Sequence, residues 1–131
     1  MRAQRKDKNH QFIAAVFAGM GHYAQDMDRT EGFDMLVHGT FGPWVVEVKS
    51  GPKEKLTDNE KAKKAAIETA DGRYHIVVTG FDALGILGLT VGDLITRQRL
   101  EIMGRIDRLK KIDEDVQPMV DEFYRALAAP F

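Results

Sequence analysis

Three charged residues lie where the sequence predicts a β-hairpin, and their types suit metal-dependent chemistry. The stretch 32–50 reads GFDMLVHGTFGPWVVEVKS, with Asp34 before the first strand-like run and Glu47 and Lys49 at the end of the second. Two neighbouring carboxylates repel each other unless a cation neutralises them. Mg²⁺ favours sites with one or two carboxylates, waters and substrate phosphate. A lysine beside such a site could orient or deprotonate a water, or stabilise charge on a phosphate in the transition state.

The geometry of a hairpin decides whether the three side chains can meet. Side chains alternate between the two faces along a strand, so Glu47 and Lys49 share a face. A turn at 40–41 places Asp34 opposite Glu47, whereas a turn at 40–43 places it opposite Lys49. Both of these loops have an even number of residues and place the three charged side chains on one face. A loop with an odd number of residues would need a β-bulge to do so. The alternative is a solvent-facing edge on which Glu47 and Lys49 are ordinary surface charges, because E-x-K is common on strands.

Basic residues flank this segment in the chain and would attract phosphates. Thr57 and Glu60 have the spacing of a capping box, which predicts a helix from about Asp58 to Thr69 with its N-terminal amides available to an anion. The lysines around this helix start, and a second basic cluster near the chain start, are candidate nucleic-acid contacts: Lys53, Lys55, Lys61 and Lys64, with Arg5, Lys6 and Lys8. The alternative for a lysine run is a solvated helix face.

Hydrophobic periodicity predicts the elements that must position these residues. Helical spacing covers 9–18, a weakly patterned strand follows within 22–28, and after the hairpin and the 58–69 helix come a strand in 73–80 and a short helix or turn in 81–88. A strand–helix–strand unit has parallel strands. The predicted fold is therefore α/β, with a mixed central sheet (an antiparallel hairpin plus a parallel strand) flanked by helices.

The last third of the chain has a different pattern. Residues 91–131 form an amphipathic helical pattern interrupted near 113–119, where Pro118 suits the first turn of a second helix. Its apolar stripe comprises Ile95, Ile102, Ile106, Leu109, Val116, Val120, Phe123 and Leu127, and it is broken at Arg99 and Asp113. These helices either pack over the sheet or also build a dimer interface. We expect a core at 1–88 and a helical extension at 89–131 that serves as a dimerisation element of a homo-oligomer.

Composition limits the remaining possibilities. The chain has 131 residues, no cysteine and a formal net charge of -1, which suits one globular domain without disulfides or a cysteine zinc site. It contains no secretory signal pattern and no apolar run of about 18 residues, so we expect no membrane partner and a cytoplasmic location. A polyanion would have to be held by a local basic patch.

The segments GFDMLV, WVVEVKSG and KLTDNEKA, in this order, resemble the PD-(D/E)XK nuclease superfamily, in particular its small VRR-NUC-like, bacteriophage-type branch. The likeness covers roughly 7–87 and implies a restriction-endonuclease-like core. It implies that Asp34 and Glu47 are metal ligands, that the Val48 carbonyl is a third ligand oxygen and that Lys49 is the catalytic lysine. Two further positions would lie near the active centre: Glu60, and Gln11 (or Asn9 beside it) at the first-helix position where many members carry glutamate.

The resemblance also has departures. Phe33 stands where the family has proline, and no acid occurs from Lys8 to Ala18, which argues against a second metal ion. The implied activity is a Mg²⁺- or Mn²⁺-dependent DNA endonuclease, structure-specific for junctions, flaps or nicks. One alternative is a catalytically inactive nuclease-fold module that binds nucleic acid or protein. A weaker alternative is a scaffold or inhibitor whose working surface is the C-terminal stripe.

Overall fold

A four-stranded mixed sheet forms the centre of the fold. The structure, a computed structural model, describes residues 7–129. The sheet has the order β1 (Tyr23–Asp26), β2 (Met35–His38), β3 (Trp44–Val48), β4 (Tyr74–Val77). β2 pairs antiparallel with both β1 and β3, and β4 pairs parallel with β3. The predicted α/β class, with a hairpin and one added parallel strand, is confirmed.

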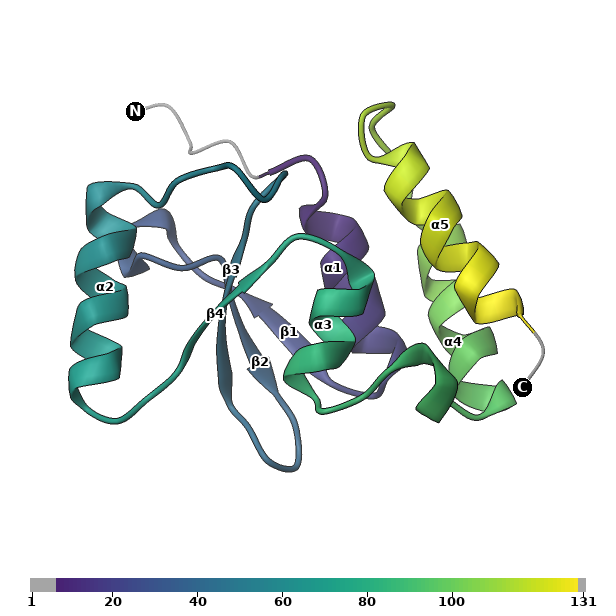
Figure 1. Cartoon of the computed structure of the whole chain (residues 1–131), viewed down its shortest axis with the longest axis horizontal. Helices are drawn as coiled ribbons and strands as arrows, with labels where there is room; N and C mark the ends of the chain where they lie inside the picture. The colour runs from purple at the N-terminus through teal and green to yellow at the C-terminus, as the bar shows by residue number, and fades with distance from the viewer. Residues whose placement is uncertain (1–6, 130–131) are drawn as a thin grey trace.

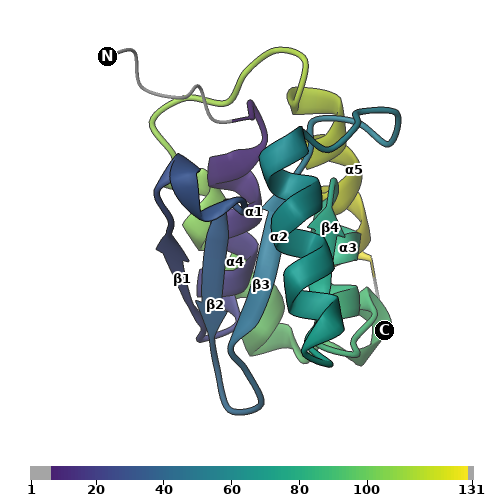
Figure 2. The ribbon, with the colours of Figure 1, turned by 90° about the vertical axis from the view of Figure 1, so that its left-hand side faces the viewer.

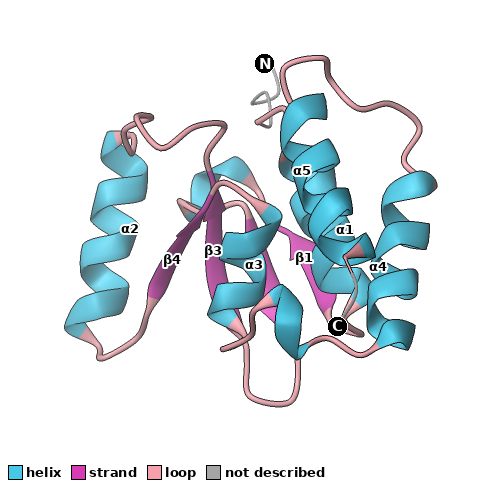
Figure 3. Cartoon of the chain, turned by 45° about the vertical axis from the view of Figure 1, so that its right-hand side comes forward, coloured by secondary structure: helices cyan, strands magenta, loops and turns pink. Residues whose placement is uncertain are grey.

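Helices cover the two faces of the sheet unequally. They are α1 (His10–Gly19), α2 (Asp58–Thr69), α3 (Gly80–Ile86), α4 (Thr96–Asp107) and α5 (Gln117–Ala128), with short 3-10 turns η1 (Arg29–Glu31) and η2 (Val91–Asp93). Helix α2 covers one face, α1 and α3 lie against the other, and α4 and α5 form a further layer beyond α1 (Figures 1 and 3). Among residues 7–129, no helix has the length and apolar character needed to cross a bilayer.

Local sequence signals account for the element boundaries near the charged cluster. The Thr57 hydroxyl accepts from the Glu60 N–H at 3.2 Å, and Glu60 Oε1 accepts from the Thr57 N–H at 2.8 Å. This capping box fixes the start of α2, and the helix spans 58–69 as predicted. In α5, Pro118 stands in the first turn, where its missing N–H leaves no bond unmade.

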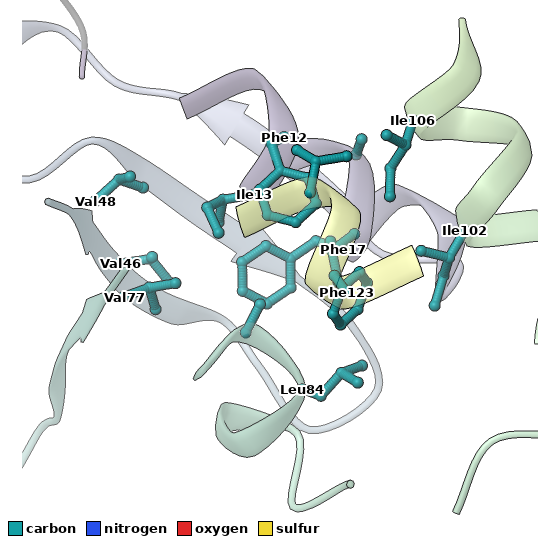
Figure 4. Packing of buried hydrophobic residues seen from close by; sticks show 14 of the residues in the cluster. Phe12, Ile13, Phe17, Val46, Val48, Val77, Leu84, Ile102, Ile106 and Phe123 are labelled. Atoms are coloured by element: carbon teal, nitrogen blue, oxygen red, sulfur yellow. The ribbon is translucent and has the colours of Figure 1, made fainter. Parts of the chain in front are cut away.

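The core lies between the sheet and α1, and it continues into the C-terminal helices. Phe12 and Phe17 of α1 belong to the same hydrophobic cluster as Val46 of β3, and all three side chains are buried. Phe123 of α5 meets Phe12 edge to face, with ring centroids 5.7 Å apart (Figure 4). Gly80 allows this packing, because a Cβ there would lie 2.9 Å from the Phe123 ring.

Most of the C-terminal stripe packs into the chain's own core. Ile102, Ile106, Phe123 and Leu127 are at most 2% exposed and belong to the same core as residues of 1–88. Of the stripe, only Ile95 is largely exposed, at 60%. These side chains are therefore not available to a partner subunit or to a target of an inhibitor. Self-association remains a prediction for which this stripe supplies no surface.

Candidate active site

The hairpin register brings the three predicted charged residues to one face of the sheet. Met35 pairs with Val46, as expected for a turn at 40–41. The same register, continued by one position, places Asp34 beside Glu47. The side chains of Val46 and Val48 are buried in the core, so those of Glu47 and Lys49 point to the opposite face of the sheet. That face is the one covered by α2, which lies in front of β3 and β4 in Figure 2.

Lys49 joins two carboxyl groups from different elements. Its Nζ lies 2.8 Å from Glu60 Oε1 on α2 and 3.4 Å from Glu47 Oε2 on β3. All three residues are buried, with 2–7% of their surface exposed. Because buried charges are tolerated only when paired, this triad fixes the distance between α2 and the end of β3.

Asp34 is held beside the triad by the backbone of β3. Its Oδ2 accepts a hydrogen bond from the Val48 N–H at 2.7 Å, and its own N–H donates to the Val46 carbonyl at 3.1 Å. The Val48 side chain is buried in the core on the other face. The carboxylate of Asp34 is therefore oriented toward β3, and Val48 contributes to the site through its backbone.

The three ionisable groups of the triad shift one another's proton affinities. Burial raises the pKa of Glu47, and its hydrogen bond with Glu60 and the charge of Asp34 raise it further. Burial would also raise the pKa of Glu60, but hydrogen bonds with Glu47, Lys49 and the Thr57 backbone lower it overall. Burial would lower the pKa of Lys49, but the hydrogen bond to Glu60 and the charge of Glu47 raise it. Lys49 therefore lies between two carboxyl groups whose pKa values are shifted in opposite directions.

Glu47 has the properties of a group that a cation would stabilise. Its Oε1 is buried and has no hydrogen-bond partner among residues 7–129. No group of three or more His, Asp or Glu side chains in that part of the chain is arranged to hold a metal ion. A cage made by the protein alone is therefore absent there, whereas Asp34 and Glu47 match the one or two carboxylates that Mg²⁺ prefers.

The start of α1 contributes Asn9, which the resemblance named as the alternative to Gln11, and Asp7, which it did not assign. Asn9 Nδ2 donates to the carbonyls of Lys49 at 2.9 Å and Val78 at 2.7 Å, which ties this helix to the ends of β3 and β4. Burial raises the pKa of Asp7 to about 6, and the charges of Glu54 and Asp34 add to the shift. Asp7 thus lies within electrostatic range of Asp34, Lys49 and Glu60. Asp7 directly precedes the acid-free stretch from Lys8 to Ala18, so it lies outside the positions that the motif indicates.

Tyr74 belongs to this face of the sheet although the motif did not specify it, whereas the predicted Gln11 does not. The Tyr74 hydroxyl donates to the Gly32 carbonyl at 2.7 Å, and burial together with the charges of Glu47, Glu60 and Asp34 raises its pKa. Tyr74 therefore lies beneath the acids on the α2 face. Gln11 does not join them: it is exposed and lines a groove between α1, β1 and α4.

The predicted nucleic-acid contacts are dispersed around the site. Lys53, Lys55 and Lys61 are exposed. Lys64 pairs with Glu68 at 2.7 Å on α2, and Lys8 pairs with Asp115 at 2.6 Å in the loop before α5. Arg5 and Lys6 lie outside the described residues. Contact of these side chains with nucleic acid stays a prediction.

No family model, curated protein or solved structure matches this chain. A function therefore has to be inferred from the side chains of the site and from the sequence resemblance.

Proposed function

We propose that the chain is a metal-dependent DNA endonuclease that hydrolyses phosphodiester bonds with Mg²⁺ or Mn²⁺. The observation that carries this proposal is the convergence of Asp34, Glu47 and Lys49 on one face of the sheet. The sequence resemblance to PD-(D/E)XK nucleases supports the same reaction, because it assigns the acid and lysine positions to these residues.

Each residue has a role that follows from its contacts. Asp34 and Glu47 would hold the cation, with the Val48 carbonyl as a third oxygen. When bound, Mg²⁺ or Mn²⁺ supplies positive charge that acidifies water and polarises the phosphate. Lys49 keeps its proton at neutral pH because its pKa is raised, so it would donate a hydrogen bond to a phosphate oxygen. Glu60 would hold the Lys49 ammonium in place.

The substrate assignment rests on chemistry and on analogy. Exposed lysines at 53, 55 and 61 lie near the start of α2, where they would contact phosphates on either side of a scissile bond. A preference for junctions, flaps or nicked duplexes follows from the resemblance alone.

The direct test is cleavage of supercoiled plasmid and of branched DNA. The purified chain should nick DNA with Mg²⁺ or Mn²⁺ and not with a chelator present. Lys49→Ala should reduce the rate by at least about 100-fold, since it removes the charge beside the phosphate. Lys110→Ala, at an exposed lysine outside the predicted nucleic-acid contacts, should cleave normally. Equal cleavage by the Lys49→Ala protein would remove Lys49 from the mechanism.

A second candidate function is favoured by one contact. Lys49 already pairs with Glu47 and Glu60, so the charges of the cluster are partly balanced within the chain. Such a cluster would also suit a catalytically inactive module that uses this fold to bind nucleic acid or protein. In that case DNA binding would be equally tight with chelator and with Mn²⁺, and no nicking would accompany it.

A further inference from the structure

A groove lies on the face of the sheet opposite to the acidic cluster. It has a volume of about 710 Å³ and runs between α1, β1 and the C-terminal end of α4. Figures 1 and 3 place α1 and α4 side by side on the far side of the sheet from α2. We call it the α1–α4 groove; its polar lining consists of His10, Gln11, His22, Tyr23, Asp26, Arg105 and Arg108.

Small residues keep the groove open. Ala14 and Ala18 of α1, Gly21 and Ala24 line it, so no long side chain from these positions fills the space. The helices that bound it are held at a fixed separation, because a Cβ at Gly19 would lie 2.6 Å from Ile102 Cα. The volume falls in the range of about 300–1,000 Å³ that is usual for small-molecule sites.

One wall of the groove carries two guanidinium groups. Arg105 lies in the last turn of α4 and Arg108 is its C-cap residue, three positions further on, so both guanidinium groups lie at the same end of the helix. The Arg105 Nε donates to Glu101 Oε1 at 3.1 Å, which fixes the direction of that side chain. Among the described residues that line the groove, Asp26 is the only acidic one. The lining therefore favours an anion.

The opposite wall presents hydrogen-bond acceptors. His10 is 4% exposed, and its Nε2 lies 2.9 Å from Asp26 Oδ1. In the neutral ring this contact places the proton on Nε2 and leaves Nδ1 as an acceptor. Nδ1 is buried and has no partner among residues 7–129. Ligand hydroxyl groups can reach the Asp26 carboxylate, whose side chain is 54% exposed, while the buried His10 ring holds that carboxylate at the groove.

We propose that the α1–α4 groove binds a small organic phosphate of the sugar-phosphate and nucleotide class. The phosphate lies on Arg105 and Arg108, and the sugar hydroxyls face Asp26 and His10. A phosphate group has enough oxygens for both guanidinium forks, whereas a carboxylate has only two. The groove lies on the other face of the sheet from Asp34 and Glu47, so this proposal can be tested independently of the nuclease proposal.

The single tryptophan provides a local signal for binding. The ring of His22, which lines the groove, lies 5.6 Å from the ring of Trp44. Trp44 is the only tryptophan of the chain. Its fluorescence and isothermal calorimetry would be followed while the full-length chain is titrated with inorganic phosphate, ribose 5-phosphate, AMP and adenosine. Ribose 5-phosphate and AMP should bind more tightly than phosphate alone, and adenosine should not bind.

Matched variants locate the site. The double variant Arg105→Gln/Arg108→Gln should weaken ribose 5-phosphate binding by at least about tenfold. Arg97→Gln/Lys110→Gln removes the same charge from exposed positions that do not line the groove and should bind normally. Ala18→Leu fills the groove without changing charge and should also abolish binding. Circular dichroism would confirm that all variants fold.

Three results would overturn the proposal. The first is no binding of ribose 5-phosphate or AMP at about 10 mM, well above a millimolar dissociation constant. The second is equal weakening in both double variants, which would show general attraction to positive charge. The third is binding that neither Ala18→Leu nor the Arg105/Arg108 variant alters, which would place the ligand elsewhere.

Discussion

Lys49 Nζ lies 2.8 Å from Glu60 Oε1, and that same oxygen accepts the Thr57 N–H that begins α2. One carboxylate therefore both caps a helix and holds the lysine of the candidate active site. The capping box, a signal for local structure, is in this chain also a part of the site.

Glu60→Gln separates these two roles. Glutamine can serve in a capping box, so α2 should persist, with a loss in unfolding free energy of roughly 1 kcal/mol. The Lys49 ammonium loses its anionic partner, so DNA cleavage should fall by about tenfold or more. Glu68→Gln, at an exposed position of the same helix, is the control and should leave cleavage unchanged. Full activity of Glu60→Gln would show that Lys49 does not depend on this contact.

Asp7 should destabilise the fold at neutral pH. Its pKa is raised from 3.8 to about 6, so the folded state binds more protons than the unfolded state between these values. The contribution of Asp7 to the unfolding free energy therefore falls as the pH rises from about 4 to 6. Asp7→Asn should raise the unfolding free energy at pH 7 by roughly 1 kcal/mol, after allowance for solvent screening.

Urea unfolding with a chelator present would measure this effect. The gain from Asp7→Asn should disappear near pH 4, where the carboxyl group is protonated in the folded chain. Glu114→Gln, an exposed change of the same kind, should stay within about 0.5 kcal/mol of the parent at either pH. A loss of stability at pH 7 on Asp7→Asn would contradict the placement of Asp7 beside the other acids.

The contact of α1 with α4 depends on a glycine. A Cβ at Gly19 would lie 2.6 Å from the Cα of Ile102, which is backbone and cannot rotate away. Gly19→Ala should lower the unfolding free energy by roughly 1–3 kcal/mol. Gly85→Ala in α3, where a Cβ has no neighbour within 4 Å, should be neutral or stabilise by up to about 1 kcal/mol. Thermal unfolding that ranks the two variants in the reverse order would contradict this packing.

Arg99 is a structural residue of the C-terminal helices. Its guanidinium donates to the carbonyls of Leu127 at 3.0 Å and Val91 at 2.8 Å, and it also reaches those of Leu94, Ala126 and Ala129. Arg99 therefore donates hydrogen bonds to carbonyl groups at the C-terminal end of α5, which would otherwise be buried acceptors without a partner. Arg99→Leu should lower the unfolding free energy by roughly 2–4 kcal/mol.

Two further variants define the cause of that loss. Arg99→Lys should recover only part of the stability, because a single ammonium cannot reach the same set of carbonyls. Arg97→Leu, exposed on the same helix, should change little. If Arg99→Leu unfolds at the same urea concentration as the parent, these bonds do not support the fold.

The sequence predicts those features that depend on neighbouring residues. Thr57 and Glu60 define the start of α2, and the spacing of Asp34 and Glu47 about the turn defines the face they share. Arg99 was less predictable: a charge within an apolar stripe indicates a break, and its five carbonyl partners come together only once α5 has packed. Amphipathicity likewise indicates that the 95–127 stripe is covered, but not whether a partner or the chain's own α1 covers it.

The position of Asp7 depends on tertiary structure in the same way. It lies before α1, outside any motif, and reaches the site because Asn9 ties that helix to the carbonyls of Lys49 and Val78. Neither contact leaves a pattern in the sequence. The groove between α1 and α4 depends on the packing of three elements, so the hydrophobic periodicity of the sequence does not predict it.

Binding of Mn²⁺ measures the central claim most directly, because electron paramagnetic resonance distinguishes free from bound ion without any DNA. The parent chain should bind Mn²⁺, and Asp34→Asn and Glu47→Gln should each weaken binding by at least about tenfold. Glu68→Gln should bind as the parent does. Absence of binding by the parent, or equal affinity in all four proteins, would contradict a shared cation site at Asp34 and Glu47.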